Sequence, residues 1–114
     1  MLNLLFVYGT LRSEFDNEGA RTLRSQARFL RRATVPGAIY HIRDYPGFRS
    51  EPAGEVHGEI YQLPQPAATL AELDDYEGPD FERVVWSGAW IYRYRHTPSE
   101  DRRILSGDFC PPGT

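Results

Sequence analysis

Residues 2–12 read LNLLFVYGTLR, an apolar run that ends in Tyr8-Gly9-Thr10-Leu11-Arg12. The apolar side chains between Leu2 and Val7 are too closely spaced for a strand with one face in water. The pattern therefore predicts a strand that is covered on both faces. Gly9 permits a backbone turn that a residue with a side chain would resist. We expect a buried strand followed by a turn at Gly9 and Thr10.

The turn after this strand has two interpretations. The simpler one is a connecting loop without any further role. The other is a binding site, because a buried strand that stops at a Gly-Thr turn leaves backbone N–H groups free at its carboxyl end. Where such N–H groups converge, they form a cradle for a carboxylate or a phosphate.

Length and composition predict one globular domain over residues 1–110, with residues 111–114 as a frayed tail. Hydrophobic residues make up 40% of the 114 residues and aromatic residues 13%, which argues against disorder. The net charge of −3 provides no general attraction to nucleic acid or to an anionic membrane. We see no stretch of roughly 20 apolar residues and no secretion signal, so we expect neither a membrane nor a nucleic-acid partner.

The cysteine and lysine content excludes several kinds of catalytic and binding site. Cys110 is the only cysteine, so no internal disulfide can form, and a reducing cytoplasm is the expected location. Its position beside two prolines near the carboxyl end argues against a nucleophile. All 13 basic residues are arginines, which excludes a Schiff-base lysine and a P-loop lysine.

Residues 19–31 have helical spacing, with Asp16 or Asn17 as candidate N-cap. The apolar stripe of this predicted helix consists of Ala20, Leu23, Ala27 and Leu30. Beside it runs a row of arginines: Arg21, Arg24, Arg28 and Arg31. This row is either a nucleic-acid surface or a solvated helix flank, and the acidic total charge favours the flank.

The remaining elements alternate between strands and a second helix. We predict strands at 38–42, 55–63, 82–86 and 89–95, a turn at 44–47 and a helix at 67–76. Ser87-Gly88 predicts a two-residue hairpin turn, and Gly58 in mid-strand predicts a bulge, a bend or close approach of a ligand. The pattern predicts an α+β fold: a small mixed β-barrel of about five to seven strands with two flanking helices.

The sequence lacks the residue patterns of most common catalytic and binding sites. The three histidines, His41, His57 and His96, have no ligand spacing for a metal. His57 reads as a hydrogen-bonded wall residue of a strand, and no Gly-x-Ser-x-Gly motif is present for a serine hydrolase. The aromatic residues at 86–94 have no basic groove beside them and therefore read as core or cavity lining.

Carboxylates remain, and the chain has 16 of them. Glu77 stands out because it lies at the end of the second predicted helix, next to Tyr76 and before the Gly78-Pro79 turn. Acidic residues at a helix carboxyl end oppose the helix dipole, which hints at a role other than stability. The alternative is a solvated acidic helix end.

The blocks taken together resemble the gamma-glutamylcyclotransferase-like superfamily, most closely the gamma-glutamylamine cyclotransferase branch and its small bacterial members. The resemblance covers nearly the whole chain in the family's order. It is carried by residues 8–12, 45–47, 58–61, 73–78, 81–84 and 104–109. Phe109 departs from the pattern, since the family often has tryptophan there.

The resemblance implies a compact mixed β-barrel with one cavity and release of 5-oxoproline from a gamma-glutamyl compound, without a metal or an organic cofactor. It implies a substrate-binding loop at Tyr8, Gly9, Thr10 and Leu11. It also implies that Glu77 is the catalytic general acid and base. Two rival hypotheses stay open: a non-catalytic barrel of the same fold that binds a small metabolite, and a nucleic-acid-binding protein that uses the arginine row.

Overall fold

The computed structural model describes residues 1–109. Its elements, in chain order, are β1 (Leu4–Val7), α1 (Glu18–Gln26), β2 (Arg28–Pro36), β3 (Ala38–His41), β4 (Pro46–Arg49), β5 (Glu55–Gln62), α2 (Pro66–Glu77), β6 (Phe81–Trp86), β7 (Ala89–Tyr94) and the 3-10 turn η1 (Glu100–Arg102). None of the helices in residues 1–109 is long and apolar enough to span a membrane. Cys110 and the predicted tail at 111–114 lie outside the described residues.

The strand β1 is central and buried on both faces, as predicted. Leu5, Phe6 and Val7 are at most 3% exposed. Leu5 and Val7 join the apolar cluster that also contains the helix residues Leu23, Leu70 and Leu73. Because side chains alternate along a strand, Phe6 and Tyr8 point to the other face. There they join a second cluster inside the curl of the sheet.

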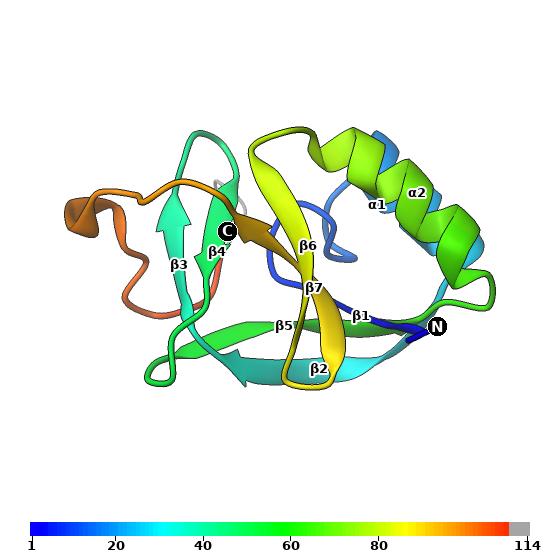
Figure 1. The fold of residues 1–114 in the computed structure, drawn as a ribbon, viewed down its shortest axis with the longest axis horizontal. Helices are drawn as coiled ribbons and strands as arrows, with labels where there is room; N and C mark the ends of the chain where they lie inside the picture. Colours follow the sequence, from blue (N-terminus) through cyan, green and yellow to red (C-terminus); the bar gives the residue numbers. More distant parts are fainter. Residues whose placement is uncertain (110–114) are drawn as a thin grey trace.

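Seven strands form one mixed sheet that curls into a half-barrel (Figure 1). The order is β2-β5-β1-β7-β4-β3, with β6 paired to β7. The strand β7 is a branch point because it has three partners. It runs parallel to β1 at Trp90, parallel to β4 at Arg93, and antiparallel to β6 along its length. The predicted α+β fold with five to seven strands and two helices is confirmed.

The two helices lie side by side over one face of the sheet (Figure 1). Asn17 is the N-cap of α1, and its side chain accepts a hydrogen bond from the Ala20 N–H. The helices are joined by Gln26, which donates to Glu72 at 2.5 Å and accepts from the Thr69 hydroxyl at 2.8 Å. These two bonds fix α2 relative to the end of α1.

The predicted helix at 19–31 is wrong in its second half. The helix α1 ends at Gln26, and Ala27 is already extended with φ −137° and ψ 162°. Residues 28–36 form β2, which pairs antiparallel with β5 from Arg28↔Gln62 to Pro36↔Glu55. This pairing supplies the backbone hydrogen bonds, and local apolar spacing cannot reveal a partner 19 to 34 residues away.

The arginine row is divided by this change. Arg21 and Arg24 remain on α1 and lie 2.8 Å and 3.6 Å from Asp16, whereas Arg28 and Arg31 belong to β2. Leu30 of the predicted apolar stripe is 38% exposed for the same reason. A single helical face of four arginines is therefore absent from residues 1–109.

The two predicted turns and the mid-strand Gly58 differ in how well the structure matches the prediction. The hairpin turn at Ser87-Gly88 is confirmed, with φ values of 55° and 86°. The predicted turn at 44–47 ends early, because Pro46 and Gly47 already belong to β4. Gly58 allows a close approach, but of the protein itself: a Cβ there would lie 2.2 Å from the Val7 carbonyl oxygen. The pairing of β2 with β5 has one shift of register, which lies on β2 between Phe29 and Arg31.

Candidate active site

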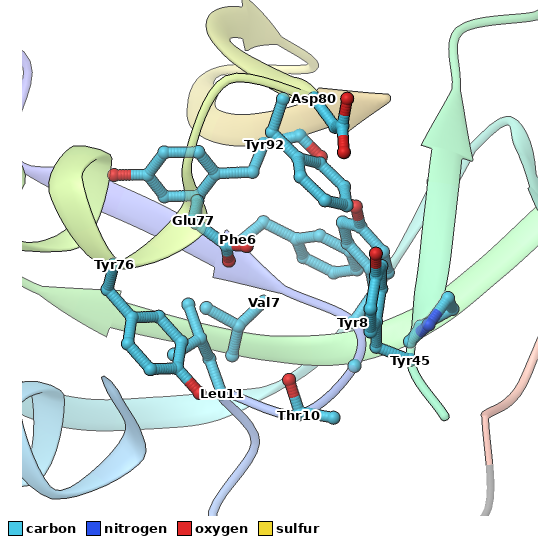
Figure 2. Close-up of a pocket in the computed structure, with 13 residues that line it drawn as sticks. Phe6, Val7, Tyr8, Thr10, Leu11, Tyr45, Tyr76, Glu77, Asp80 and Tyr92 are labelled. Atoms are coloured by element: carbon cyan, nitrogen blue, oxygen red, sulfur yellow. The ribbon is translucent and has the colours of Figure 1, made fainter. Parts of the chain in front are cut away.

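One cavity of about 320 Å³ opens where β1, β4 and α2 end or begin (Figure 2). Its walls come from residues 6–11, 45–46, 76–77 and 80–81, and from Tyr92. All five residues that the sequence assigned to a site line this one cavity: Tyr8, Gly9, Thr10, Leu11 and Glu77. Segments nearly seventy residues apart therefore meet, and the geometry of each segment follows.

The loop after β1 presents free backbone donors. A tight turn is closed by the Arg12 N–H, which donates to the Gly9 carbonyl at 3.0 Å. Within residues 1–109, the N–H groups of Gly9, Thr10 and Leu11 donate no hydrogen bond. Unpaired N–H groups of this kind favour an anion. The loop can therefore act as the predicted cradle.

Gly9 has a steric role that differs from the predicted one. Its φ does not lie in the left-handed region that only glycine favours. A Cβ on Gly9 would lie 2.6 Å from Pro46 Cγ, which is closer than real Cβ contacts. Glycine is therefore required because the first residue of β4 packs directly against the loop.

Buried charges anchor the loop from behind. Arg12 is 7% exposed, and its Nη1 donates to Asp108 at 2.7 Å and to the Phe109 carbonyl at 3.2 Å. Glu14 lies 2.5 Å from Arg12 Nε. The guanidinium is thus held between two carboxylates, which compensates for its lost hydration.

Glu59 and Asn17 complete this anchoring. The buried Glu59 carboxylate accepts from the Ser13 N–H at 2.8 Å and from the Ser13 hydroxyl at 2.6 Å. Asn17 donates to the Thr10 carbonyl at 2.7 Å and also accepts from the Tyr76 hydroxyl at 3.1 Å. Because these contacts hold the loop on both sides, its free N–H groups are fixed in position.

The Tyr8 hydroxyl is used by the protein and is not free for a ligand. It donates to the Tyr92 carbonyl at 2.6 Å and accepts from the Phe48 N–H at 3.1 Å. These two partners lie on β7 and β4, so Tyr8 closes the gap where β7 passes from one partner strand to the other. Burial, followed by the charge of Glu77, raises the pKa of Tyr8 well above its ordinary value. Tyr8 therefore contributes its ring and backbone to the cavity wall.

Glu77 is the last residue of α2, and its side chain points into the cavity (Figure 2). Gly78 then turns the chain with φ 80°, a value that side-chain-bearing residues resist. Burial raises the pKa of Glu77 to about 7. Its carboxyl group has no hydrogen-bond donor or ion-pair partner anywhere in the described part of the chain. A carboxyl group with this pKa can both accept and release a proton near neutral pH.

The acidic end of α2 is partly explained by Asp74. Arg83 donates two hydrogen bonds to this carboxylate, at 2.8 Å and 3.1 Å, and the Tyr92 hydroxyl donates a third at 2.7 Å. Burial opposes ionisation, but these bonds outweigh it and lower the pKa of Asp74. The cluster attaches the end of α2 to β6 and β7, which fixes the direction of Glu77.

Sequence reasoning missed part of the cavity wall. Tyr45, Asp80, Phe81 and Tyr92 line the cavity without having been predicted as site residues. Tyr92 gave a signal, since it lies in the predicted strand at 89–95, whose aromatic residues were interpreted as core or cavity lining. Phe81 directly precedes the predicted strand at 82–86. Asp80 gave none, because a single aspartate after a Gly-Pro turn is common in loops.

Comparison with known proteins identifies the family. The profile of the family described as "Gamma-glutamyl cyclotransferase, AIG2-like" matches residues 5–111. A protein of Vibrio cholerae, named "Putative gamma-glutamylcyclotransferase", is 36% identical over 118 residues, which cover 96% of this chain and 97% of the relative. The chain belongs to the gamma-glutamyl cyclotransferase, AIG2-like family.

Solved structures share the same architecture. Protein YtfP of Escherichia coli is 32% identical with a TM-score of 0.69, covering 92% of this chain and 94% of its own. Protein PH0828 of Pyrococcus horikoshii has a TM-score of 0.76 at 23% identity, over 93% and 88% of the two chains. An AIG2-like protein of mouse has a TM-score of 0.63 at 22% identity, over 88% and 81%. At these lower identities the likeness concerns the fold alone.

Proposed function

We propose that this protein is a gamma-glutamylamine cyclotransferase, an enzyme that releases 5-oxoproline and a free amine from a gamma-glutamyl amine or peptide. One observation carries the proposal: the Glu77 carboxyl group, with a pKa of about 7, shares a cavity with a loop of free backbone N–H groups. Membership of the family supports the same reaction class.

The loop binds the constant part of the substrate. The N–H groups of Gly9, Thr10 and Leu11 donate to the α-carboxylate of the gamma-glutamyl group. No side-chain cation is needed, because several backbone dipoles directed at one carboxylate stabilise its charge. The anchored loop makes this arrangement available without reorganisation.

Glu77 performs the proton transfers. In its ionised form it accepts a proton from the α-ammonium group, and the free amine then attacks the γ-carbonyl carbon of the same molecule. The new C–N bond closes a five-membered ring, and the bond from the γ-carbon to the leaving nitrogen breaks. Glu77 returns the proton to that nitrogen as the bond breaks. The ionised carboxylate then accepts the second proton, which the ring nitrogen loses as it becomes the lactam N–H, and passes it to the departing amine. One carboxyl group therefore serves all of the proton transfers.

Orientation of the bound substrate accounts for much of the rate enhancement in this proposal. Because the nucleophile and the carbonyl belong to one molecule, the protein only has to hold the folded conformer of the substrate. Good intramolecular orientation can contribute on the order of 7–11 kcal/mol to lowering a barrier. A fixed loop at one side of the cavity and Glu77 at the other meet this requirement.

The direct test replaces the proposed acid and base. The Glu77→Gln variant keeps the shape of the side chain, so it should fold, and it should lose about 100- to 10,000-fold in 5-oxoproline release. Asp75→Asn is the matched control, because Asp75 is an exposed carboxylate on the same helix that does not line the cavity. Unchanged turnover in Glu77→Gln would exclude this role. Calorimetric binding without product in the wild type would instead identify a binding barrel.

A further inference from the structure

The charged side chains that line the cavity are acidic. Among the described residues that line it, the ionisable groups other than tyrosines are Glu77 and Asp80, and none is arginine, lysine or histidine. A gamma-glutamyl group brings one α-carboxylate and one α-ammonium to this cavity. The loop donors offset the first and Glu77 the second, so the charge of Asp80 is left without a partner from the constant part of the substrate.

Asp80 is held in place at the far end of the cavity. Figure 2 shows Thr10 and Asp80 on opposite sides of the view, with Glu77 between them. The Asp80 carbonyl accepts the Arg95 N–H at 2.8 Å, and Asp80 Oδ1 lies 2.8 Å from His96 Nε2. The Arg95 side chain donates to the Phe81 carbonyl at 3.2 Å and lies 3.8 Å from Glu82. Within residues 1–109, Asp80 Oδ2 has no hydrogen-bond or ion-pair partner.

Aromatic side chains form part of the wall of the same cavity. Tyr45, Phe81 and Tyr92 line the cavity, and the rings of Tyr45 and Phe81 lie 6.0 Å apart. Aromatic surfaces pack well against an alkyl chain, and their faces attract cations. A substrate that enters with its glutamyl end at the loop therefore extends its leaving amine along these rings toward a carboxylate.

We infer that Asp80 is a specificity-determining residue, which selects gamma-glutamyl compounds whose leaving amine carries a second ammonium group. The inference rests on the proposed cyclotransferase function. The preferred substrate class is a mono-gamma-glutamyl diamine: its acylated nitrogen lies near Glu77 and its free ammonium group lies near Asp80. Because Asp80 is exposed, solvent weakens this pair, and we expect a preference of roughly five- to tenfold.

Matched substrates isolate this charge. Gamma-glutamyl derivatives of 1,3-diaminopropane, 1,4-diaminobutane and 1,5-diaminopentane are each compared with a neutral n-alkylamine derivative of equal chain length. The measured quantity is the ratio of kcat/KM for 5-oxoproline release, cationic over neutral. The wild type should give a ratio of about five or more for at least one length, and this ratio should fall as salt is added.

Variants identify the residue responsible. Asp80→Asn keeps an oxygen beside His96 and should bring the ratio close to one, whereas the control Asp75→Asn should keep the wild-type ratio. Asp80→Arg should invert the preference, toward a substrate whose leaving amine ends in a carboxylate. Thermal unfolding of each variant shows that it is folded.

The outcomes separate this inference from the proposed function. Release of 5-oxoproline from both substrates with a wild-type ratio of one overturns the selection and leaves the cyclotransferase function standing. A high ratio that Asp80→Asn does not change overturns the role of Asp80. If no gamma-glutamyl compound yields 5-oxoproline, the proposed function fails, and the inference fails with it.

Discussion

Glu77 loses hydration in the folded protein, and this loss sets the pH at which it can work. Its pKa rises from an ordinary value of 4.5 to about 7 because of burial. In the proposed reaction Glu77 acts as a base toward the α-ammonium group, so it must be ionised before that reaction begins. The proposal therefore predicts that the protonation state of Glu77 limits the rate near neutral pH.

The first residue-scale prediction concerns the pH profile. The kcat/KM for 5-oxoproline release should rise about tenfold per pH unit below pH 6, bend at about pH 7 and level off above about pH 8. The measurement is a series of initial rates between pH 5 and pH 8 at constant ionic strength. A profile that is flat over this range, or one that bends near pH 4.5, would contradict a buried base at this position.

The second prediction concerns stability, and its sign follows from the raised pKa. Below pH 4.5 both the folded and the unfolded chain hold the Glu77 proton, so burial has its smallest cost. As the pH rises to 7 the unfolded chain releases that proton first, and the free energy of unfolding decreases. The difference of 2.5 pH units (7 − 4.5) sets an upper limit of about 3 kcal/mol.

Glu77→Gln removes this titration. The variant should therefore unfold at a higher temperature than the wild type at pH 8, and the difference should shrink at pH 5. Thermal unfolding followed by circular dichroism at the two pH values tests the prediction. An equal difference at both values would show that Glu77 does not titrate inside the cavity.

At the scale of elements, the loop after β1 depends on its contact with β4. A Cβ on Gly9 would overlap Pro46 Cγ at 2.6 Å, so Gly9→Ala must displace either the loop or the start of the strand. We expect a loss of about 1–3 kcal/mol in stability. We also expect a larger proportional loss in kcat/KM, because the loop N–H groups move.

A second substitution serves as the control for this prediction. Pro46→Ala removes the ring atoms that a Cβ at position 9 would strike. The double variant Gly9→Ala/Pro46→Ala should therefore lose less stability than the sum of the two single variants. Strict additivity would show that the contact between loop and strand does not determine the loop position.

The strands and helices also differ in how well the sequence alone predicted them. The apolar run at 2–7 predicted a strand covered on both faces, and the structure forms it at 4–7, because dense apolar residues in the local sequence indicate burial on both sides. The segment 28–36 was misread as helix, because its partner β5 is distant in sequence. The loop and Glu77 came from local signatures and a family resemblance. Asp80 joins the cavity only through the tertiary fold, and no local pattern marks it.

At the scale of the whole molecule, the branching of the sheet at β7 creates the cavity. The partner strands β1 and β4 meet β7 at different points, and Tyr8 bridges them with its hydroxyl group. The helix α2 then covers the carboxyl end of β1 and brings Glu77 to the opening (Figure 2). The half-barrel thus brings the free backbone N–H groups of the loop after β1 and the Glu77 carboxyl group, whose pKa is raised, into one cavity.

The central claim is that the substrate amine attacks its own γ-carbonyl group, and an isotope experiment tests it most directly. The wild-type protein is incubated with a gamma-glutamyl amine in water enriched in ¹⁸O, and the products are identified by mass spectrometry. We predict 5-oxoproline without ¹⁸O, in equal amount to the released amine, because no water enters an intramolecular cyclisation. Glutamate that carries ¹⁸O in its γ-carboxyl group would show hydrolysis by water and would contradict the account.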